Sequence, residues 1–135
     1  MFLIDTNVWL ELLLKQEKAD EVRHFFMNID ADFLSITEFS LYSIGIILTR
    51  LKKDELFKNF LSDTIEDSGV GIVRLNIDDL KHLLTMCHKY QLDFDDAYQY
   101  VASEKYELIL VSFDNDFDRT ERKRKTPLES LKDFD

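Results

Sequence analysis

The sequence has few of the residues that cross-link or interrupt a chain: of its 135 residues, one is cysteine, one is proline and three are glycine. The single cysteine, Cys87, excludes an internal disulfide and fits a reducing compartment. The glycines form no nucleotide-binding loop. With 45% hydrophobic and 33% charged residues, the composition is that of an ordered globular protein of one domain, 1–135.

Long hydrophobic runs are also missing. The longest apolar stretch, 39–51, is interrupted by serine, threonine and arginine, and it is too short and too polar to span a bilayer. The N-terminus runs directly into Phe2 to Asp5 without a basic region or a cleavage site, so we expect no secretory signal. We therefore expect a cytoplasmic protein with no membrane partner.

Basic residues are fewer than acidic residues, and the resulting net charge of −10 argues against a nucleic-acid binder that works by charge alone. The charge is compatible with an enzyme whose acids gather around metal ions. One basic segment, 119–125, follows Asp114 and Asp116. It could steer a phosphate chain toward those acids, or it could be a solvated loop that pairs with the protein's own acidic excess. The residues that would contact substrate phosphates are Arg119, Arg122 and Lys123.

Short apolar runs alternate with segments of helical periodicity along the chain. The strand-like runs are 2–4, 33–36, 70–75 and 108–113. The helical segments lie at about 8–14, 22–29, 39–51, 56–65, 80–87 and 94–101. This alternation predicts an α/β domain with a central parallel sheet of about four to five strands and helices on both faces. Asp95 is predicted to cap the helix that begins at 96, with Asp93 in the loop before it.

Three of the four strand-like runs end at an acidic residue: Asp5, Glu38 (after Thr37) and Asp114. Because parallel strands end at one edge of the sheet, these acids should converge in the crevice there. Like charges that close cannot all stay ionised without a cation, so the pattern predicts a hard-metal site. Asp5 could instead cap the following helix, and the two roles do not exclude each other.

Two further acids have weaker or different signals. Asp96 should lie beside the apolar stripe of its helix, where an unpaired carboxylate is costly and needs a metal ion or water as partner. Asp116 belongs to an Asp-Asn-Asp cluster, which commonly forms a turn by bonding its own backbone.

Three segments, 2–7, 95–97 and 111–117, together resemble the PIN-domain family in order and spacing. The likeness covers a core of about residues 1–120 and leaves a short basic C-terminal segment. Many family members of this size are Mg²⁺- or Mn²⁺-dependent endoribonucleases, including the toxins of VapBC toxin–antitoxin pairs. The resemblance therefore implies a PIN-like domain, a site of three or four acids, frequent homodimers and, for a toxin, an antitoxin protein as partner.

Carried over by position, the resemblance assigns catalytic or metal-binding roles to four acids and supporting polar roles to three neighbours. The acids are Asp5, Asp96, Asp114 and Asp116; the polar neighbours are Thr6, Asn7 and Ser112. The family's second acid usually lies about a turn inside the helix after the second strand, but the stretch 39–45 has none. Either Glu38 reaches the site from a shifted position, or the site has lost a ligand.

The leading interpretation is a metal-dependent endoribonuclease in which Asp5, Asp96 and Asp114 hold one or two Mg²⁺ or Mn²⁺ ions. Glu38 or Asp116 would accept the proton or complete the coordination. The alternative is a binding module that keeps the fold without the catalysis and acts through a partner protein. The missing helix acid favours it, as do 11 Phe, five Tyr and one Trp, since aromatic residues are enriched at interfaces.

Overall fold

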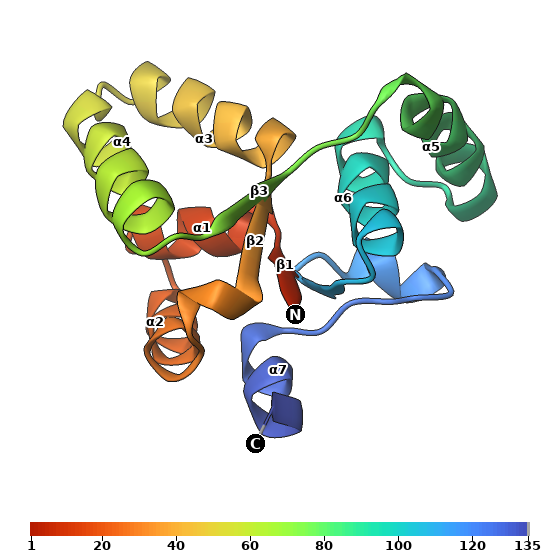
Figure 1. The fold of residues 1–135 in the computed structure, drawn as a ribbon. Coiled ribbons are helices and arrows are strands. Elements are labelled where there is room, and N and C mark those ends of the chain that lie inside the picture. Colours follow the sequence, from red (N-terminus) through yellow and green to blue (C-terminus); the bar gives the residue numbers. More distant parts are fainter. Residues whose placement is uncertain (135) are drawn as a thin grey trace.

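Four short parallel strands form one sheet in the computed structural model, which describes residues 1–134 (Figure 1). Their order across the sheet is β3-β2-β1-β4, with β1 paired to both β2 and β4. The strands are β1 (Phe2–Ile4), β2 (Leu34–Thr37), β3 (Gly71–Val73) and β4 (Ile109–Val111). The predicted parallel α/β sheet is confirmed.

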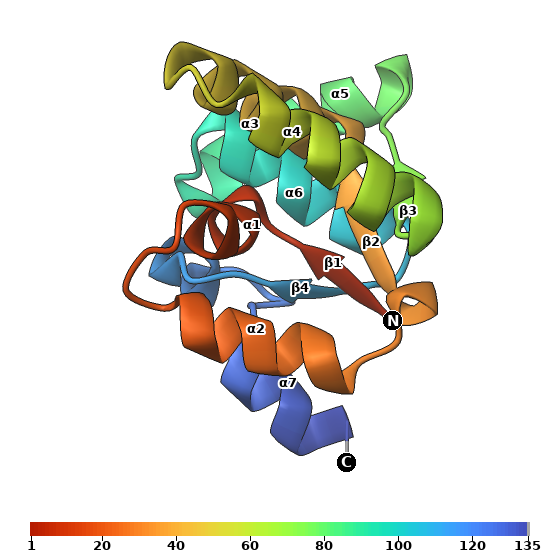
Figure 2. The same ribbon diagram turned by 90° about the vertical axis from the view of Figure 1, so that its left-hand side faces the viewer.

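Helices follow each strand and supply both covering layers (Figure 2). The α-helices are α1 (Thr6–Leu13), α2 (Ala19–Asn28), α3 (Glu38–Arg50), α4 (Asp54–Phe60), α5 (Ile77–Tyr90), α6 (Phe94–Lys105) and α7 (Pro127–Phe134). Shorter helical segments are the 3₁₀ turns η1 (Ala31–Phe33) and η3 (Asn115–Arg119) and the π-helical η2 (Leu61–Asp67), which continues α4. Among the helices of residues 1–134, none combines the length and the hydropathy needed to cross a membrane.

The alternation of side chains along β1 divides the core into two layers. Phe2 and Ile4 pack into one buried cluster with residues of α1 to α4 and α7, whereas Leu3 packs into a second cluster with α5 and α6. Successive side chains of a strand point to opposite faces, so a continuous apolar strand needs helices on both sides. Figure 1 shows α1 to α4 on one side of the sheet and α5 and α6 on the other.

Polar residues at the strand ends determine where several helices begin. Asp5 caps α1 by accepting from the Thr6 N–H, and the Thr37 hydroxyl caps α3 by accepting from the Ser40 N–H. At α6 the predicted cap was wrong: the N-cap residue is Asp93, not Asp95, and its side chain makes no capping bond. The helix begins earlier because acidic residues are also favoured within a first turn, where they face the positive end of the helix dipole.

The chain reverses its direction across the sheet between β1 and β4. It passes from β1 to β2 to β3 on one side and then crosses to place β4 on the other side of β1. In open parallel sheets the crevice at such a reversal, beyond the carboxyl ends of the strands, is the usual ligand site. Asp5 and Asp114 follow these two neighbouring strands.

The C-terminal segment folds onto the domain, although the sequence analysis predicted no helix there. Thr126 and Glu129 cap α7 reciprocally, and Pro127 occupies its first position. Before the helix, Lys125 bonds to the backbone of β4 on its free edge, and Leu131 joins the apolar core. The edge of β4 is thereby partly covered.

Candidate metal centre

A cavity of about 370 Å³ opens beyond the carboxyl ends of β1 and β4. Its polar lining comes from α1, α3, α6 and the segment after β4. The lining residues are Asp5, Thr6, Asn7, Leu10, Phe39, Ser43, Ile47, Asp95, Asp96, Gln99 and Asp114. Three of the predicted acids, from three separate parts of the chain, therefore share one cavity.

Asp96, Asp114 and Asp116 form the tightest arrangement of acids at this cavity. One oxygen from each carboxylate lies within 4.8 Å of the others, and all three residues are half-buried. Mg²⁺ binds oxygen ligands at about 2.0–2.1 Å, so oxygens on opposite sides of one ion are about 4.2 Å apart. The oxygens of these three residues therefore fit a single small divalent cation with little movement.

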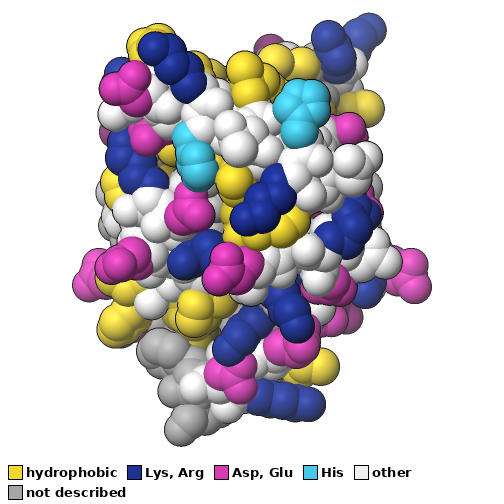
Figure 3. All heavy atoms as spheres, turned by 90° about the vertical axis from the view of Figure 1, so that its right-hand side faces the viewer, with side chains coloured by type: hydrophobic (Ala, Val, Ile, Leu, Met, Phe, Trp, Pro, Cys, Tyr) yellow, Lys and Arg dark blue, Asp and Glu magenta, His cyan; other side chains and the backbone are white. Residues whose placement is uncertain are grey.

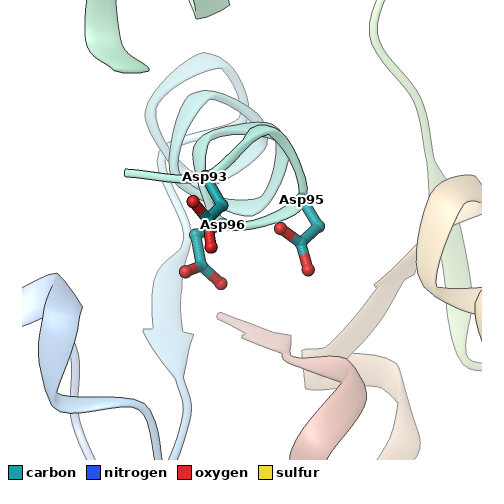
Figure 4. A group of neighbouring side chains, drawn as sticks. All are labelled: Asp93, Asp95 and Asp96. Atoms are coloured by element: carbon teal, nitrogen blue, oxygen red, sulfur yellow. The ribbon is translucent and has the colours of Figure 1, made fainter. Parts of the chain in front are cut away.

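A second group of acids surrounds the start of α6. Oxygens of Asp93, Asp95 and Asp96 also lie within 4.8 Å of one another, and Figure 4 shows the three carboxylates leaving the first turn on the same side. Asp93 and Asp95 are exposed, whereas Asp96 belongs to both groups. Exposed acids of this kind are common without a metal, so the shared residue, Asp96, is the informative one.

Asp5 lies deeper than the other acids and is only 5% exposed. Its Oδ1 accepts from the Thr6 N–H at 2.8 Å and from Gln99 Nε2 at 3.0 Å. Its Oδ2 accepts from Ser112 Oγ at 2.7 Å and Asn7 Nδ2 at 3.3 Å. A carboxylate has about four lone-pair positions, so the protein itself satisfies all of them.

The polar neighbours of Asp5 connect it to the end of β4. Ser112 Oγ accepts from the Asp114 N–H at 3.0 Å, and Asn7 Oδ1 accepts from the Phe113 N–H at 3.2 Å. The backbone that carries Asp114 is therefore held by the same side chains that bind Asp5. Thr6, the third polar neighbour predicted from the sequence, lies within 2.7 Å of the Ser40 hydroxyl.

Burial and neighbouring charges favour the protonated forms of two of the acids. Burial, followed by the charges of Asp114, Asp95 and Asp5, raises the pKa of Asp96 to about 7. Burial also raises the pKa of Asp5, although its hydrogen bonds from Ser112, Gln99 and Thr6 oppose the shift. A bound cation would offset this effect, because its positive charge favours the ionised carboxylates.

Gln99 and Ser40 are site residues that the sequence analysis missed. Gln99 lies three residues after Asp96 on α6, is 2% exposed, and donates to both Asp5 and Ser40. Its neighbours three and four residues away on the helix are Asp95, Asp96, Ala102 and Ser103, so Gln99 interrupts no apolar stripe and gives no local signal. Its partners lie 59 and 94 residues away in sequence, so no local pattern could have identified them.

Glu38 lies outside the acidic groups. It is the first residue of α3, it does not line the cavity, and it belongs to neither group of acids. Within residues 1–134 its side chain makes no hydrogen bond or ion pair. The residues of α3 that line the cavity are Phe39, Ser43 and Ile47. The catalytic role predicted for Glu38 stays a prediction without geometric support.

The basic segment binds mainly to the protein itself. Arg119 donates to the carbonyls of Tyr90 and Gln91 and pairs with Asp116 at 3.0 Å, so it lies beside the acids. Arg122 donates to the carbonyls of Ser103 and Leu108. Ser103 is seven residues beyond Asp96, which places Arg122 roughly 10 Å farther along α6.

Lys123 lines a separate cavity with Arg122 beside the edge of β4, not the cavity of the acids. On this side of the molecule, basic and acidic side chains are interspersed rather than gathered by sign (Figure 3). Of the three proposed phosphate contacts, only Arg119 thus lies next to the acidic site. The role of all three in binding RNA stays a prediction.

The sequence of residues 2–123 matches the family model described as PIN domain. No curated protein matches the chain in sequence.

Solved structures share the fold at low sequence identity. FitAcB from Neisseria gonorrhoeae has a TM-score of 0.78 at 17% identity, covering 95% of this chain and 99% of its own. A chain of a toxin–antitoxin complex from Klebsiella pneumoniae has a TM-score of 0.75 at 16% identity, covering 94% and 98%. VapC20 of Mycobacterium tuberculosis, described as a sarcin-ricin loop cleaving toxin, has a TM-score of 0.74 at 15% identity, covering 87% and 93%.

Proposed function

Because the chain belongs to the PIN-domain family, we propose that it is a divalent-cation-dependent endoribonuclease that hydrolyses RNA phosphodiester bonds. The observation that carries the proposal is the grouping of Asp96, Asp114 and Asp116 beside the buried Asp5 in one cavity. The description of VapC20 as a sarcin-ricin loop cleaving toxin supports the substrate class.

The proposed cation is Mg²⁺ or Mn²⁺, held by Asp96, Asp114 and Asp116. Hard cations prefer such oxygen ligands and keep several waters. When bound, the cation supplies Lewis-acid activation of water and offsets charge on the phosphate. Asp5 adds negative charge and holds the backbone before Asp114 through Ser112 and Asn7. Arg119, beside Asp116, is the basic side chain best placed to contact a substrate phosphate.

The test is cleavage of a single-stranded RNA in Mn²⁺ by the protein and by an Asp5→Asn/Asp96→Asn double variant. We expect the double variant to lose at least about 10- to 100-fold in rate, because mutating even the residues that orient metal ligands typically costs that much. The control is Asp20→Asn/Asp78→Asn, which makes the same charge change at two highly exposed side chains. Equal cleavage by all three proteins would reject the proposal.

A protein partner is the second part of the proposal. An apolar cavity of about 240 Å³ is lined by aromatic and aliphatic side chains of α1, α2 and α4, among them Trp9, Phe26 and Phe60. We propose that the protein is the toxin of a toxin–antitoxin pair and that apolar side chains of the antitoxin occupy this cavity. Phe26→Ala, at a partly exposed residue of this cavity, should then weaken co-purification with the antitoxin while Mn²⁺-dependent cleavage by the free protein persists.

The alternative function is a binding module that acts through this apolar surface without catalysis. It is favoured by one observation: α3 supplies no acid to the cavity, because Glu38 lies outside it. A binding module should show no cleavage and no Mn²⁺-dependent change in melting temperature, whereas a metal enzyme gains stability by mass action.

A further inference from the structure

The floor of the acidic cavity contains a buried amide, that of Gln99. Its Nε2 donates to Asp5 Oδ1 at 3.0 Å and to Ser40 Oγ at 2.9 Å, and its Oε1 accepts from Thr37 Oγ1 at 2.7 Å. Gln99 is 2% exposed, and both Thr37 and Ser40 are fully buried. The amide thus joins α6 to the end of β1 and to the start of α3.

The hydrogen-bond network fixes which end of this amide faces the acids. Thr37 Oγ1 accepts the Ser40 N–H at 2.9 Å, so its own proton is free to go to Gln99 Oε1. With Oε1 committed to Thr37, the two N–H groups must face Asp5 and Ser40. The opposite orientation would place two acceptor oxygens, Oε1 and Asp5 Oδ1, 3.0 Å apart. The positive ends of the amide dipoles therefore point into the floor of the cavity.

Gln99 approaches Asp5 from the side of α3, because the same amide nitrogen also donates to Ser40 of that helix. Oδ1 is occupied by Gln99 and the Thr6 N–H, and Oδ2 by Ser112 and Asn7. A cation could reach Asp5 Oδ1 only by displacing one of two buried donors, and an N–H left without an acceptor in a buried site is costly. The N–H dipoles also repel positive charge.

The α3 wall offers no replacement ligand. Its lining residues are Phe39, Ser43 and Ile47, none of which is acidic. Ser40 is a turn inside the helix, but its hydroxyl is bound to Gln99 and Thr6. Among residues 1–134, the groups of three acids with oxygens close enough to share a cation lie on the opposite wall, at the start of α6 and after β4.

We propose that Gln99, together with Ser40, closes the α3 side of the cavity to cations, so that the site holds a single divalent cation, on the side of Asp96, Asp114 and Asp116. Gln99 acts as a positioning residue: it holds Asp5 in place and occupies, with donors, the space where a second cation would need acceptors. The inference deepens the proposed function and rests on it.

The first test counts bound Mn²⁺ on the unaltered protein by calorimetric titration and by electron paramagnetic resonance. We expect one Mn²⁺ per chain and no spin coupling between neighbouring ions. Two coupled ions would overturn this inference and leave the proposed nuclease intact. Absence of any bound Mn²⁺ would overturn both the inference and the proposed function. Cleavage assays on the same sample would show whether the nuclease activity itself is present.

The second test adds a carboxylate at the closed wall with Gln99→Glu. When ionised, the new acid cannot donate to Asp5 and repels it, so the metal-free variant should melt at a lower temperature near neutral pH. It should bind a second Mn²⁺ that restores the loss. Gln99→Met is the matched control: it has a similar length, no donor and no charge, and it should bind one Mn²⁺.

One result would contradict the role of Gln99: a single Mn²⁺ bound to a folded Gln99→Glu protein. Circular dichroism establishes that each variant is folded. If Gln99→Glu does not fold, the count on the unaltered protein decides the proposal: one Mn²⁺ supports it, and two overturn it. Neither readout depends on catalytic activity, and a merely structural role for Gln99 would not change the number of bound ions.

Discussion

The Asp96 carboxyl lies in surroundings that favour its protonated form. Burial contributes most to this, and the nearby charges of Asp114, Asp95 and Asp5 add to it, which together raise its pKa to about 7. Asp5, although more buried, has four donors that stabilise its charge, and Asp96 has no such set. Asp96 is thus expected to change charge near neutral pH.

Binding of Mn²⁺ should therefore strengthen as the pH rises toward about 7. A proton and the cation compete for Asp96, so below its pKa the apparent dissociation constant should increase by up to about tenfold per pH unit. Calorimetric titrations between pH 5.5 and 8 would measure this. An affinity that does not vary over this range would contradict the shifted pKa of Asp96.

The stability of the metal-free protein should depend on pH in the opposite sense. Because the folded-state pKa of Asp96 is above its ordinary value, its favourable contribution is complete at low pH and is lost as the pH rises through about 7. In EDTA, the melting temperature should be lower at pH 7.5 than at pH 5.5. The Asp96→Asn variant should show a smaller difference. Asp79, Asp118 and Glu129 have lowered pKa values, so their contributions change only in more acidic solution.

At the scale of elements, the position of α3 depends on a close contact with α4. Gly45 of α3 faces the ring of Phe57, and a Cβ at Gly45 would lie 2.9 Å from the tip of that ring. The absence of a side chain lets the two helices approach. Because α3 carries Ser40, this approach also helps to place the polar wall of the cavity.

The substitution Gly45→Val should lower the free energy of unfolding by about 1–3 kcal/mol, because it overpacks the α3–α4 contact by more than the helix gains from losing a glycine. Phe57→Leu in the same chain should recover part of the loss, since it removes the ring that clashes. Urea unfolding measures both. Ile46→Val, at a neighbouring residue that is 51% exposed, should change stability by no more than about 0.5 kcal/mol.

At the scale of the whole molecule, the domain has a net charge of −10 and gathers several of its acids at one edge of the sheet. Self-repulsion of this kind destabilises the compact state. A cation bound only by the folded protein would relieve the local part of that repulsion. Overall stability should therefore report on occupancy of the site.

Mn²⁺ at about 100 times its dissociation constant should stabilise the protein by about 2.7 kcal/mol. For a domain of this size, that is a rise in melting temperature on the order of 10 °C. The Asp96→Asn/Asp114→Asn double variant should show a much smaller rise. Thermal melts in EDTA and in Mn²⁺ provide the comparison, and an unchanged melting temperature of the unaltered protein would favour the binding module.

The sequence by itself determined the features that depend on short stretches of chain. Alternating apolar runs and helical periodicity predicted the parallel sheet and its two helical layers, because both patterns reflect which side chains must be buried locally. The acids that follow Ile4 and Phe113 were recognisable for the same reason: a polar residue directly after a buried strand lies at the sheet edge.

Only the tertiary structure decided which of these residues meet. Gln99 contacts Asp5 because α6 packs against the sheet beside β1, and the sequence does not encode that contact locally. Glu38 looked equivalent to Asp5 in sequence, yet it lies outside the acidic groups. Arg122 looked like a free cation, but two backbone carbonyls accept its hydrogen bonds. Lateral packing between distant segments fixes these distances, and periodicity along one segment carries no information about them.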